Sequence, residues 1–544
     1  MVARTAAQAL VDALEKQGVD RVFCVPGESY LAVLDALRDS AIDTVVARQE
    51  GGAAMMAEAD AKLTGRPGVV FVTRGPGATN ASSGVHVAQQ DSTPLVLFAG
   101  QVERAARGRD AFQELDFPAF YGGMAKFVAE VSDGGRIPAV VADAFHAALA
   151  DRPGPTVVAL PEDMLADPCD MPAPPRIEPA DETPDAVAMR ECDRLLNAAQ
   201  RPFVIVGGST WNATAAASLA TFAETAGVPV ACAFRRQQLF VHEHPHYAGD
   251  VGIGMNPALR HAIEETDLLL LLGTRFSEIP SQSYQLPKAG TPVVHVHADT
   301  GEPGRVHPNV LGIHARPLPF LAASKAHGKR AAYIQGLHNA YLEWSKLPHP
   351  APGALTMSHV MQVLREALEP DAILTNGAGN YSGWLHRFHR FRRFGTQVAP
   401  TSGSMGYGLP AAIAAKLRHP TSTVVCFAGD GCFQMTGQEL ATAVQADAAV
   451  VILVVDNGMY GTIRMHQERN FPGRVHATDI ANPDFAALAE AHGAHGERVQ
   501  TNAEFAAAFA RARAANKPAL LHLKVDPEAI TPTATLSGLR AGRG

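Results

Sequence analysis

Charged and aromatic residues are scarce in this chain, and basic residues do not outnumber acidic ones. Of its 544 residues, 18% are charged and 6% are aromatic, and the formal net charge at pH 7 is −8. A nucleic-acid-binding protein usually presents a basic face to the phosphates, so this balance argues against a nucleic-acid partner. Hydrophobic residues make up 47% of the chain, a share that is typical of a globular protein with buried cores.

Cysteines are few, and long apolar runs are missing. The six cysteines show no Cys-x-x-Cys spacing, which is typical of structural thiols in a reducing compartment. No run approaches the roughly 18 apolar residues that a membrane span requires. Near the start, Asp12, Glu15 and Lys16 interrupt the apolar core that a signal peptide needs. We therefore expect a cytoplasmic protein without a membrane partner.

Repeats and low-complexity tracts are also missing; instead, short apolar runs alternate with alanine-rich stretches. Apolar strands separated by helices are typical of parallel sheets that are covered on both faces. Ten runs have this character: Val69–Thr73, Leu95–Phe98, Val157–Leu160, Phe203–Val206, Leu268–Leu272, Val293–Val296, Ile373–Thr375, Val424–Ala428, Val450–Val455 and Leu520–Val525. The fold class that we expect is therefore α/β, with doubly wound parallel sheets.

Two stretches interrupt this alternation and divide the chain into three parts. Residues 167–185 carry six prolines, and residues 327–352 contain a predicted helix before a proline-rich end. Both compositions are typical of linkers. We expect three α/β domains at residues 1–166, 186–326 and 353–530, each within the usual size range of a domain.

Oxygen-bearing side chains follow two of the predicted strands in the third domain. Gly429-Asp430-Gly431 comes after Val424–Ala428, and Asp456-Asn457 comes after Val450–Val455. Gly-Asp-Gly alone is a common turn, but both segments reach the carboxyl edge of one parallel sheet, where such sheets bind ligands. A carboxylate and an amide are ligands for a hard cation such as Mg2+, which takes its other ligands from phosphate and water. The spacing therefore favours a metal-bridged diphosphate.

Glycine-rich loops with polar residues follow or connect the strands of the first domain. They are Pro26–Ser29, Arg48–Ala54, Gly75–Asn80 and Asp91–Pro94. Glu50 opens a predicted helix, where an acid ordinarily complements the helix dipole. A further glycine-rich turn, Gly403–Gly406, precedes a predicted helix at Ala411–Leu417. It contains Met405, whose flexible side chain can fill an irregular gap.

Taken together, these segments resemble the thiamine diphosphate-dependent enzymes over essentially the whole chain. The resemblance implies a pyrimidine-binding, a central and a diphosphate-binding domain, in that order. It implies that Mg2+ is held by Asp430, Asn457 and the main-chain carbonyl of Met459. Asp456 stands where the family's fingerprint has the first of two Asn residues, so the departure keeps the ligand and changes its surroundings.

The same resemblance implies roles for residues around the cofactor's rings. Glu50 would contact N1′ of the aminopyrimidine, Met405 would wedge between the two rings, and Gly403 would offer its carbonyl to the 4′-amino group. Gln49 replaces a His that is common in the family, which we expect to affect substrate chemistry more than cofactor activation. Further cofactor contacts are implied for Pro26, Gly27, Thr73, Gly77, Asn80, Gly429, Gly431 and Tyr460.

The branch that the chain resembles is that of the acetolactate synthases, through Gly75–Asn80, Ala111–Glu114 and Gly431–Leu440. This implies a carboligase or decarboxylase that forms a carbanion (enamine) equivalent from a 2-oxo acid such as pyruvate. The alternatives are a lyase or decarboxylase of 2-hydroxyacyl- or oxalyl-coenzyme A and a benzaldehyde-lyase-type C–C lyase, so the partner is a small 2-oxo acid or aldehyde. A basic cluster could hold a coenzyme A tail or could be a solvated helix face: Arg387, Arg390, Arg392 and Arg393.

Four residues are candidates for contact with the substrate. Decarboxylases of the family carry an acid at the position of Glu28, which makes it a second catalytic candidate, although a solvated loop acid explains it equally well. Synthases line their substrate channel with a lysine at the position of Lys126. Gln90 and Gln113 complete the set.

The sequence also bears on two other classes of protein, on an FAD site and on the number of subunits. Val204–Gly208 lacks the Gly-x-Gly-x-x-Gly pattern of a dinucleotide-binding dehydrogenase. Acetolactate synthases carry a non-catalytic FAD in the central domain, where Leu272–Ser277 and His297–Asp299 would hold it. A non-catalytic regulator is disfavoured because the catalytic acid and both metal ligands are present. In relatives two subunits complete each site, which implies a homodimer or homotetramer.

Overall fold

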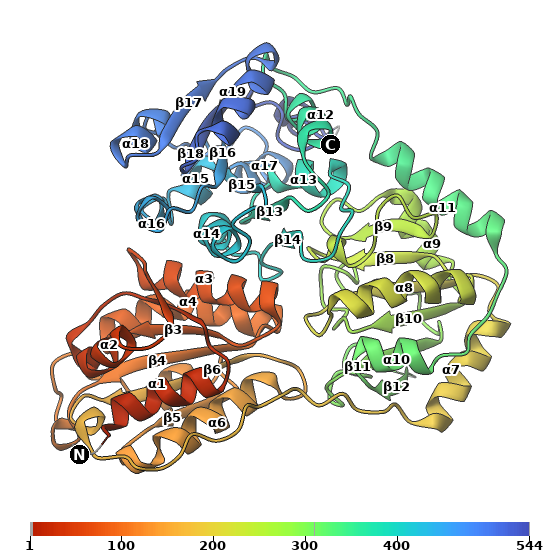
Figure 1. The fold of residues 1–544 in the computed structure, drawn as a ribbon. Coiled ribbons are helices and arrows are strands. Elements are labelled where there is room, and N and C mark those ends of the chain that lie inside the picture. The colour runs from red at the N-terminus through yellow and green to blue at the C-terminus, as the bar shows by residue number, and fades with distance from the viewer. Residues whose placement is uncertain (1–3, 309, 543–544) are drawn as a thin grey trace. The chain divides into compact units, whose positions relative to one another are not determined.

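The computed structural model describes residues 4–308 and 310–542. Residues 1–3 and 309, which the predicted domains include, lie outside the described part of the chain. Three six-stranded sheets carry the fold, and every strand pair within them is parallel (Figure 1). The α/β class predicted from the sequence is confirmed.

The first sheet has the strand order β2-β1-β3-β4-β6-β5. Its strands are β1 (Arg21–Cys24), β2 (Asp43–Val46), β3 (Gly68–Val72), β4 (Leu95–Gln101), β5 (Phe127–Glu130) and β6 (Pro155–Pro161). One face packs on α1 (Ala6–Lys16), α2 (Leu31–Arg38) and α6 (Ile137–Leu149). The opposite face packs on α3 (Glu50–Thr64) and α4 (Gly75–Asp91), and α5 (Phe117–Tyr121) lies beside β5 and β6. Burial on both faces explains why β3, β4 and β6 are apolar without alternation.

The second sheet has the order β12-β11-β10-β7-β8-β9. Its strands are β7 (Pro202–Val206), β8 (Val230–Ala233), β9 (Tyr247–Val251), β10 (Leu268–Leu272), β11 (Val293–His297) and β12 (Val310–His314). One face packs on α7 (Ala186–Ala198), α8 (Ala213–Ala226) and α10 (Pro317–Ala323). The other face packs on α9 (Pro257–Glu264) and α11 (Ala331–Trp344), the helix expected in the second linker.

The third sheet has the order β14-β13-β15-β16-β18-β17. Its strands are β13 (Ile373–Asn376), β14 (Gln397–Val398), β15 (Val424–Gly429), β16 (Val451–Asp456), β17 (His495–Val499) and β18 (Ala519–Lys524). One face packs on α12 (Met357–Ala367), α13 (Ser382–Phe388) and α19 (Asn502–Ala514). The short α15 (Asp430–Phe433) contacts β15 and β16, and α18 (Phe485–Ala491) contacts β17 and β18 at the sheet's edge. Helix α17 (Gly461–Asn470) packs with α20 (Leu536–Arg540).

Two compact units emerge from the contacts, and the smaller one is built from three separate segments. It combines the chain up to Ala180 with Pro400–Pro420 and Thr436–Ala448. The first unit therefore includes α14 (Gly408–Arg418) and α16 (Glu439–Gln445), although by sequence both belong to the expected third domain. The second unit holds the remaining residues, with the second and third sheets.

Helix α3 lies at the centre of the first unit, between α4 and α14. Its small residues permit this close packing: a Cβ on Gly84 of α4 would lie 2.4 Å from the Cβ of Ala54. Gln49, the residue before the helix, accepts a hydrogen bond from the Gly52 amide at 3.0 Å and caps the amino end. The helix ends at Gly65, whose φ of 70° suits glycine.

Charged side chains of α3 are buried against α4 and α14 and are paired there. The Lys62 ammonium lies 2.9 Å from Glu58 and 2.5 Å from Asp91, and each of these side chains is at most 5% exposed. The Tyr407 hydroxyl donates to the second oxygen of Glu58 at 2.5 Å. Because the two acids share one ammonium, its removal would take a positive charge away from two buried carboxylates.

We predict that Lys62→Met destabilises the first unit by about 3–5 kcal/mol, the usual cost of breaking a buried ion pair from one side. Urea unfolding followed by circular dichroism measures this. The matched control is Lys288→Met, because Lys288 pairs with Glu265 at the surface, where a pair contributes less than about 1 kcal/mol. Equal effects of the two substitutions would contradict the prediction.

Candidate active site

Glycine and polar residues gather at the carboxyl edge of the first sheet, as the sequence predicts. Pro26–Ser29 follows β1, Glu50 follows β2, and Thr73 follows β3. The loop after β1 is pressed against the end of β3, because a Cβ on Gly27 would lie 2.5 Å from the Cβ of Thr73. The hydroxyls of Ser29 and Thr73 are 2.9 Å apart.

Glu50 is the first residue of α3, and its carboxylate is half-buried at this edge. Asn80 of α4 donates from its amide nitrogen to Oε2 of Glu50 at 3.0 Å. Gly77 lies on the other side, where an added Cβ would be 3.2 Å from Oε1 and 2.8 Å from Cγ2 of Thr73. The structure therefore brings together four predicted residues, with a carboxylate that is oriented by an amide and accessible from the edge.

Glu28 lies at the same edge but points to solvent. Its side chain is 69% exposed, and its carboxylate pairs with Arg74 at 2.5 Å. Arg74 is largely buried and also contacts Glu162 at 3.3 Å. Sequence reasoning did not include Arg74, although a basic residue between a strand and a glycine-rich helix start was a usable signal.

The other three substrate candidates lie at different places. Gln113 follows β4 at the carboxyl edge, and its carbonyl accepts a hydrogen bond from the Gly75 amide at 3.0 Å. Gln90 lies in the last turn of α4, just before β4 begins. Lys126 lies just before β5, and its ammonium donates to the carbonyls of Ala150 and Arg152 at 2.6 and 2.8 Å. Gln113 is thus on the edge that carries Glu50, whereas Gln90 and Lys126 precede their strands.

The turn that contains Met405 is anchored on both sides within the first unit. The amides of Thr401 and Ser402 each donate to the Asp91 carboxylate at 2.9 Å. The Gly406 carbonyl accepts from the Thr436 hydroxyl at 2.6 Å. Gly403 and Gly406 have φ values of 74° and 78°, which favour glycine at these two positions. The anchors leave Met405 half-buried at the tip of the turn.

The second unit brings the predicted metal ligands to the carboxyl edge of the third sheet. Gly429 ends β15 and Asp430 begins α15, while Asn457 and Met459 follow β16 (Figure 1). Asp430 accepts hydrogen bonds from the Gly431 amide at 2.8 Å and the Gly458 amide at 2.9 Å. These contacts fix the orientation of the carboxylate.

The glycines on either side of Asp430 allow aromatic rings to lie close to the loop. A Cβ on Gly429 would be 2.8 Å from the Tyr381 ring, and a Cβ on Gly431 would be 2.6 Å from the Tyr460 ring. Tyr460, a predicted cofactor contact, is therefore packed against the Gly-Asp-Gly turn. Glycine is required here for close approach, not for a positive φ.

Asp456, the departure from the family fingerprint, is fully buried and strongly bonded. One oxygen accepts from His522 and Lys524, each at 2.7 Å. The other accepts from Asn482 at 2.9 Å and from the Gly458 amide at 3.0 Å. Burial by itself would raise the pKa of Asp456, but the hydrogen bonds from His522 and Lys524 hold it well below its usual value.

The pKa of Asp430 is shifted the other way. Burial raises it, and the negative charge of Asp456 adds to the rise, while the amide of Asn482 donates to Asp430 at 2.8 Å and opposes it. A divalent cation at Asp430 would relieve this unfavourable charge. In the described part of the chain, no three His, Cys, Asp or Glu side chains form a metal-binding cluster. A site with few protein ligands fits Mg2+ that is completed by phosphate and water.

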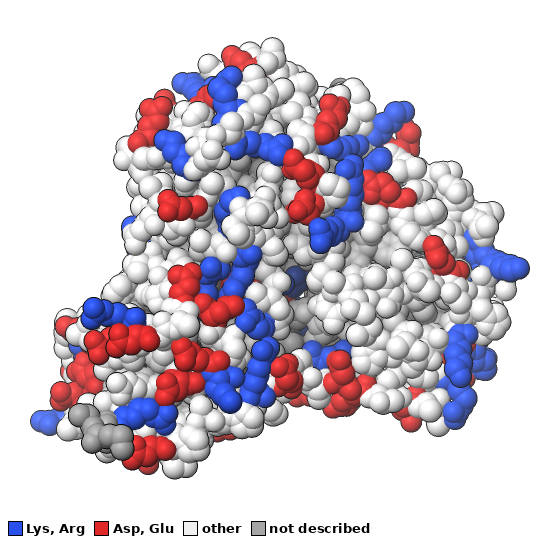
Figure 2. All heavy atoms as spheres, viewed as in Figure 1, with Lys and Arg blue, Asp and Glu red and all other residues white. Residues whose placement is uncertain are grey.

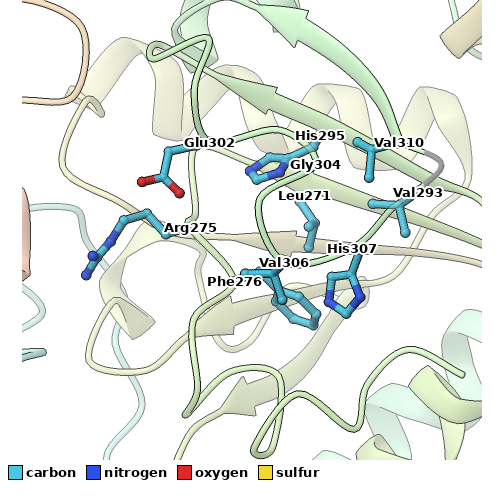
Figure 3. A pocket seen from close by; sticks show the side chains of 10 residues that line it. All are labelled: Leu271, Arg275, Phe276, Val293, His295, Glu302, Gly304, Val306, His307 and Val310. Atoms are coloured by element: carbon cyan, nitrogen blue, oxygen red, sulfur yellow. The ribbon is translucent and has the colours of Figure 1, made fainter. Parts of the chain in front are cut away.

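The central domain contains a small cavity against one face of the second sheet (Figure 3). It measures about 10 Å³, which is room for about one water molecule. Burial lowers the pKa of His295, which lines it, to about 4. The lining residues are Leu271, Arg275, Phe276, Val293, His295, Glu302, Gly304, Val306, His307 and Val310. The segments named for FAD, Leu272–Ser277 and His297–Asp299, begin at the ends of β10 and β11, and this cavity is too small for a flavin ring.

The basic cluster that starts at the end of α13 (Ser382–Phe388) is not one solvated face. Arg387 stacks on the ring of Trp344 at 3.6 Å and donates to its carbonyl, and burial lowers the pKa of Arg387 to about 10. Arg392 pairs with Glu243 at 2.9 Å. In the view of Figure 2, basic and acidic side chains are interspersed. No helix in the described residues is long and apolar enough to cross a membrane.

Comparisons with known proteins identify the family. Models of the thiamine pyrophosphate enzymes match the chain with the N-terminal binding domain at residues 4–120, the central domain at 189–323 and the C-terminal binding domain at 377–523. The chain therefore belongs to the thiamine pyrophosphate enzyme family, and it is an enzyme that depends on this cofactor.

Within that family the chain is related to the acetolactate synthases. Acetolactate synthase of Mycobacterium bovis is 34% identical over 533 residues, which cover 94% of this chain and 86% of the relative. The large subunit from Corynebacterium glutamicum is 33% identical over 553 residues, covering 96% and 87%. The isozyme 2 large subunit from Escherichia coli is 32% identical over 527 residues, covering 96% and 95%.

The hydrogen bond from Asn80 to Glu50 generates a prediction. Asn80→Ala removes a bond to an ionised group, which contributes about 1.5–3 kcal/mol, so we expect turnover at saturating cofactor to fall by about tenfold. Steady-state kinetics, with the cofactor titrated to saturation for each variant, measure this. Thr79→Ala is the control, because the neighbouring Thr79 hydroxyl donates to the Pro76 carbonyl of its own turn and not to Glu50 in the described contacts. A variant with unchanged turnover would show that Asn80 does not orient Glu50.

Proposed function

We propose that this chain is a thiamine diphosphate- and Mg2+-dependent carboligase or decarboxylase that acts on a 2-oxo acid such as pyruvate. In the proposed reaction the donor loses CO2, and its former carbonyl carbon forms a bond to the carbonyl carbon of an acceptor. The acceptor oxygen takes up a proton, so the atoms balance without an oxidant. The relation to acetolactate synthases and the carboxylate of Glu50 at the first sheet's carboxyl edge support this proposal.

Glu50 is the residue on which the chemistry depends. When bound, thiamine diphosphate supplies an electron sink for the carbanion that decarboxylation leaves. Glu50 would hold and return a proton at N1′ of the pyrimidine through the oxygen that Asn80 does not bond. Asn80 fixes the orientation of the carboxylate, and Gly77 leaves space in front of Oε1. Pro26, Gly27 and Thr73 would border the same space.

The loops after β15 and β16, in the second unit, would hold the diphosphate end of the cofactor. Asp430, Asn457 and the carbonyl of Met459 would ligate Mg2+, and Gly429 and Gly431 would let the diphosphate approach the backbone. Tyr460 packs on this turn and would border the cofactor. Gly403 and Met405 would contact the rings. The donor set of one carboxylate, one amide and one carbonyl supports Mg2+ in preference to a thiol-binding metal.

A carboligase and a decarboxylase differ in the fate of the donor carbon: it bonds to an acceptor carbonyl in the first and takes up a proton in the second. Glu28, largely exposed and paired with Arg74, lies at the edge that carries Glu50, and an acid at this place supports a simple decarboxylase as the second candidate. No described contact favours a coenzyme A substrate, since Arg387 and Arg392 are engaged by Trp344 and Glu243. Gln113 is the candidate for substrate contact at this edge.

The test of the proposed function is product analysis with a matched variant. We expect the enzyme with thiamine diphosphate and Mg2+ to consume pyruvate or benzoylformate, release CO2 and, with an acceptor aldehyde, form a new C–C product that mass spectrometry identifies. Glu50→Gln should slow turnover by at least ~100-fold, the low end of general acid–base contributions, while the cofactor still binds. Glu103→Gln, at an exposed acid of the same unit, is the control.

Two results would contradict the proposal. Unchanged turnover in Glu50→Gln would remove its assigned role. Cleavage of oxalyl- or 2-hydroxyacyl-coenzyme A, without conversion of either 2-oxo acid, would replace the proposed substrate class with the alternative one.

We also propose a homodimer or homotetramer in which the active site lies at the subunit interface. The resemblance to enzymes whose sites are completed by two subunits supports this. We expect sedimentation velocity to show a dimer or larger species, and specific activity to fall on dilution below its dissociation constant. A monomer with full activity would overturn the proposal.

A further inference from the structure

Two buried carboxylates lie side by side at the proposed cation site. Asp430 is 3% exposed and Asp456 is not exposed. Both accept hydrogen bonds from the same two donors: the Asn482 amide lies at 2.8 Å from Asp430 and 2.9 Å from Asp456, and the Gly458 amide lies at 2.9 and 3.0 Å. Two anions bound to common donors repel each other, so the pair is costly unless positive charge is nearby.

Among the described contacts, Lys524 and His522 approach the pair from the side of Asp456. In the parallel pairing of β16 with β18, Lys524 lies opposite Asp456, and His522 lies two residues earlier on the same strand. Both bond the oxygen of Asp456 that faces away from the shared donors. The ammonium and imidazole contacts are therefore all made by Asp456, while Asp430 has no Lys, Arg or His among its described contacts.

A residue that only supports the loop around Gly458 would not need to be a carboxylate at position 456. An Asn at 456 could still accept a hydrogen bond from Gly458 through its single oxygen, and a neutral side chain costs less to bury than an ionised one. An Asn could not accept from Lys524 and His522 as well, because its nitrogen only donates. The contacts that distinguish Asp from Asn here are thus the ones that place fixed charge beside Asp430.

We propose that Asp456 is a positioning residue of the cation site, resting on the proposed Mg2+-dependent function. It holds the Asn482 and Gly458 donors that orient Asp430. Its charge, balanced by Lys524, keeps the surroundings of the cation from becoming net positive. A hollow of about 220 Å³ borders Asp456 and Lys524, so water reaches this side of the pair.

The test measures Mg2+ binding directly, by calorimetry and by the Mg2+-dependent rise in melting temperature, with and without thiamine diphosphate. Asp456→Asn leaves the Lys524 ammonium unbalanced near the cation, so we expect Mg2+ to bind about tenfold more weakly, a modest effect for charges a few ångströms apart. The double variant Asp456→Asn/Lys524→Met removes both charges, and its affinity should return to within about threefold of the original.

Two further variants separate the outcomes. Glu490→Gln neutralises an exposed acid of α18 in the same unit, and we expect it to leave Mg2+ affinity unchanged. Asp430→Asn should abolish binding, which verifies that the measured site is the proposed one. Circular dichroism of each variant without metal reports whether the fold is kept.

Each result decides between distinct conclusions. Equal Mg2+ affinity in Asp456→Asn and the original protein would overturn the inference and leave the proposed function intact. A double variant as weak as Asp456→Asn would overturn the charge-balance role. Failure of the original protein to bind Mg2+ or thiamine diphosphate would overturn the proposed function and this inference with it.

Discussion

Parallel pairing of neighbouring strands is the constraint on which both groups of site residues depend. In a parallel sheet all strands end at one edge, so loops from distant parts of the sequence meet there. In the first sheet this brings Glu50, after β2, to Asn80 of α4, the helix that follows β3. In the third sheet it brings Asp430, after β15, to Gly458, after β16. The site residues therefore lie at the edges where the paired strands end.

Close backbone approach is the second requirement, and small residues meet it. The loop after β1 can touch Thr73 only because position 27 is glycine, and the Gly-Asp-Gly turn can lie against Tyr460 only because position 431 is glycine. Alanine and glycine on α3 and α4 allow the two helices to pack closely, and this fixes the start of α3, where Glu50 lies. The sequence indicated these glycines as turn residues, but it did not indicate what each one touches.

Much of the fold was predictable because strand identity is a local property. The apolar run Leu268–Leu272 is β10 without change, and Val424–Ala428 is β15 without its last residue. The family resemblance located Glu50, Asp430 and Asn457, and the structure places each after a strand at a carboxyl edge. The partner that Asp430 shares with Asp456 was not predictable, since Asn482 carries no motif of its own.

The sequence by itself determined the α/β class, the family and the residues that follow the strands, because apolar runs and turn residues act through their immediate neighbours. Only the tertiary structure decided that α14 belongs to the first unit and that Gln49 caps the helix of Glu50. It also decided that Asp456 is held ionised by two residues of β18. The physical reason is strand register: Asp456 and Lys524 meet only when β16 and β18 pair in one alignment, and that alignment depends on burial across the whole sheet.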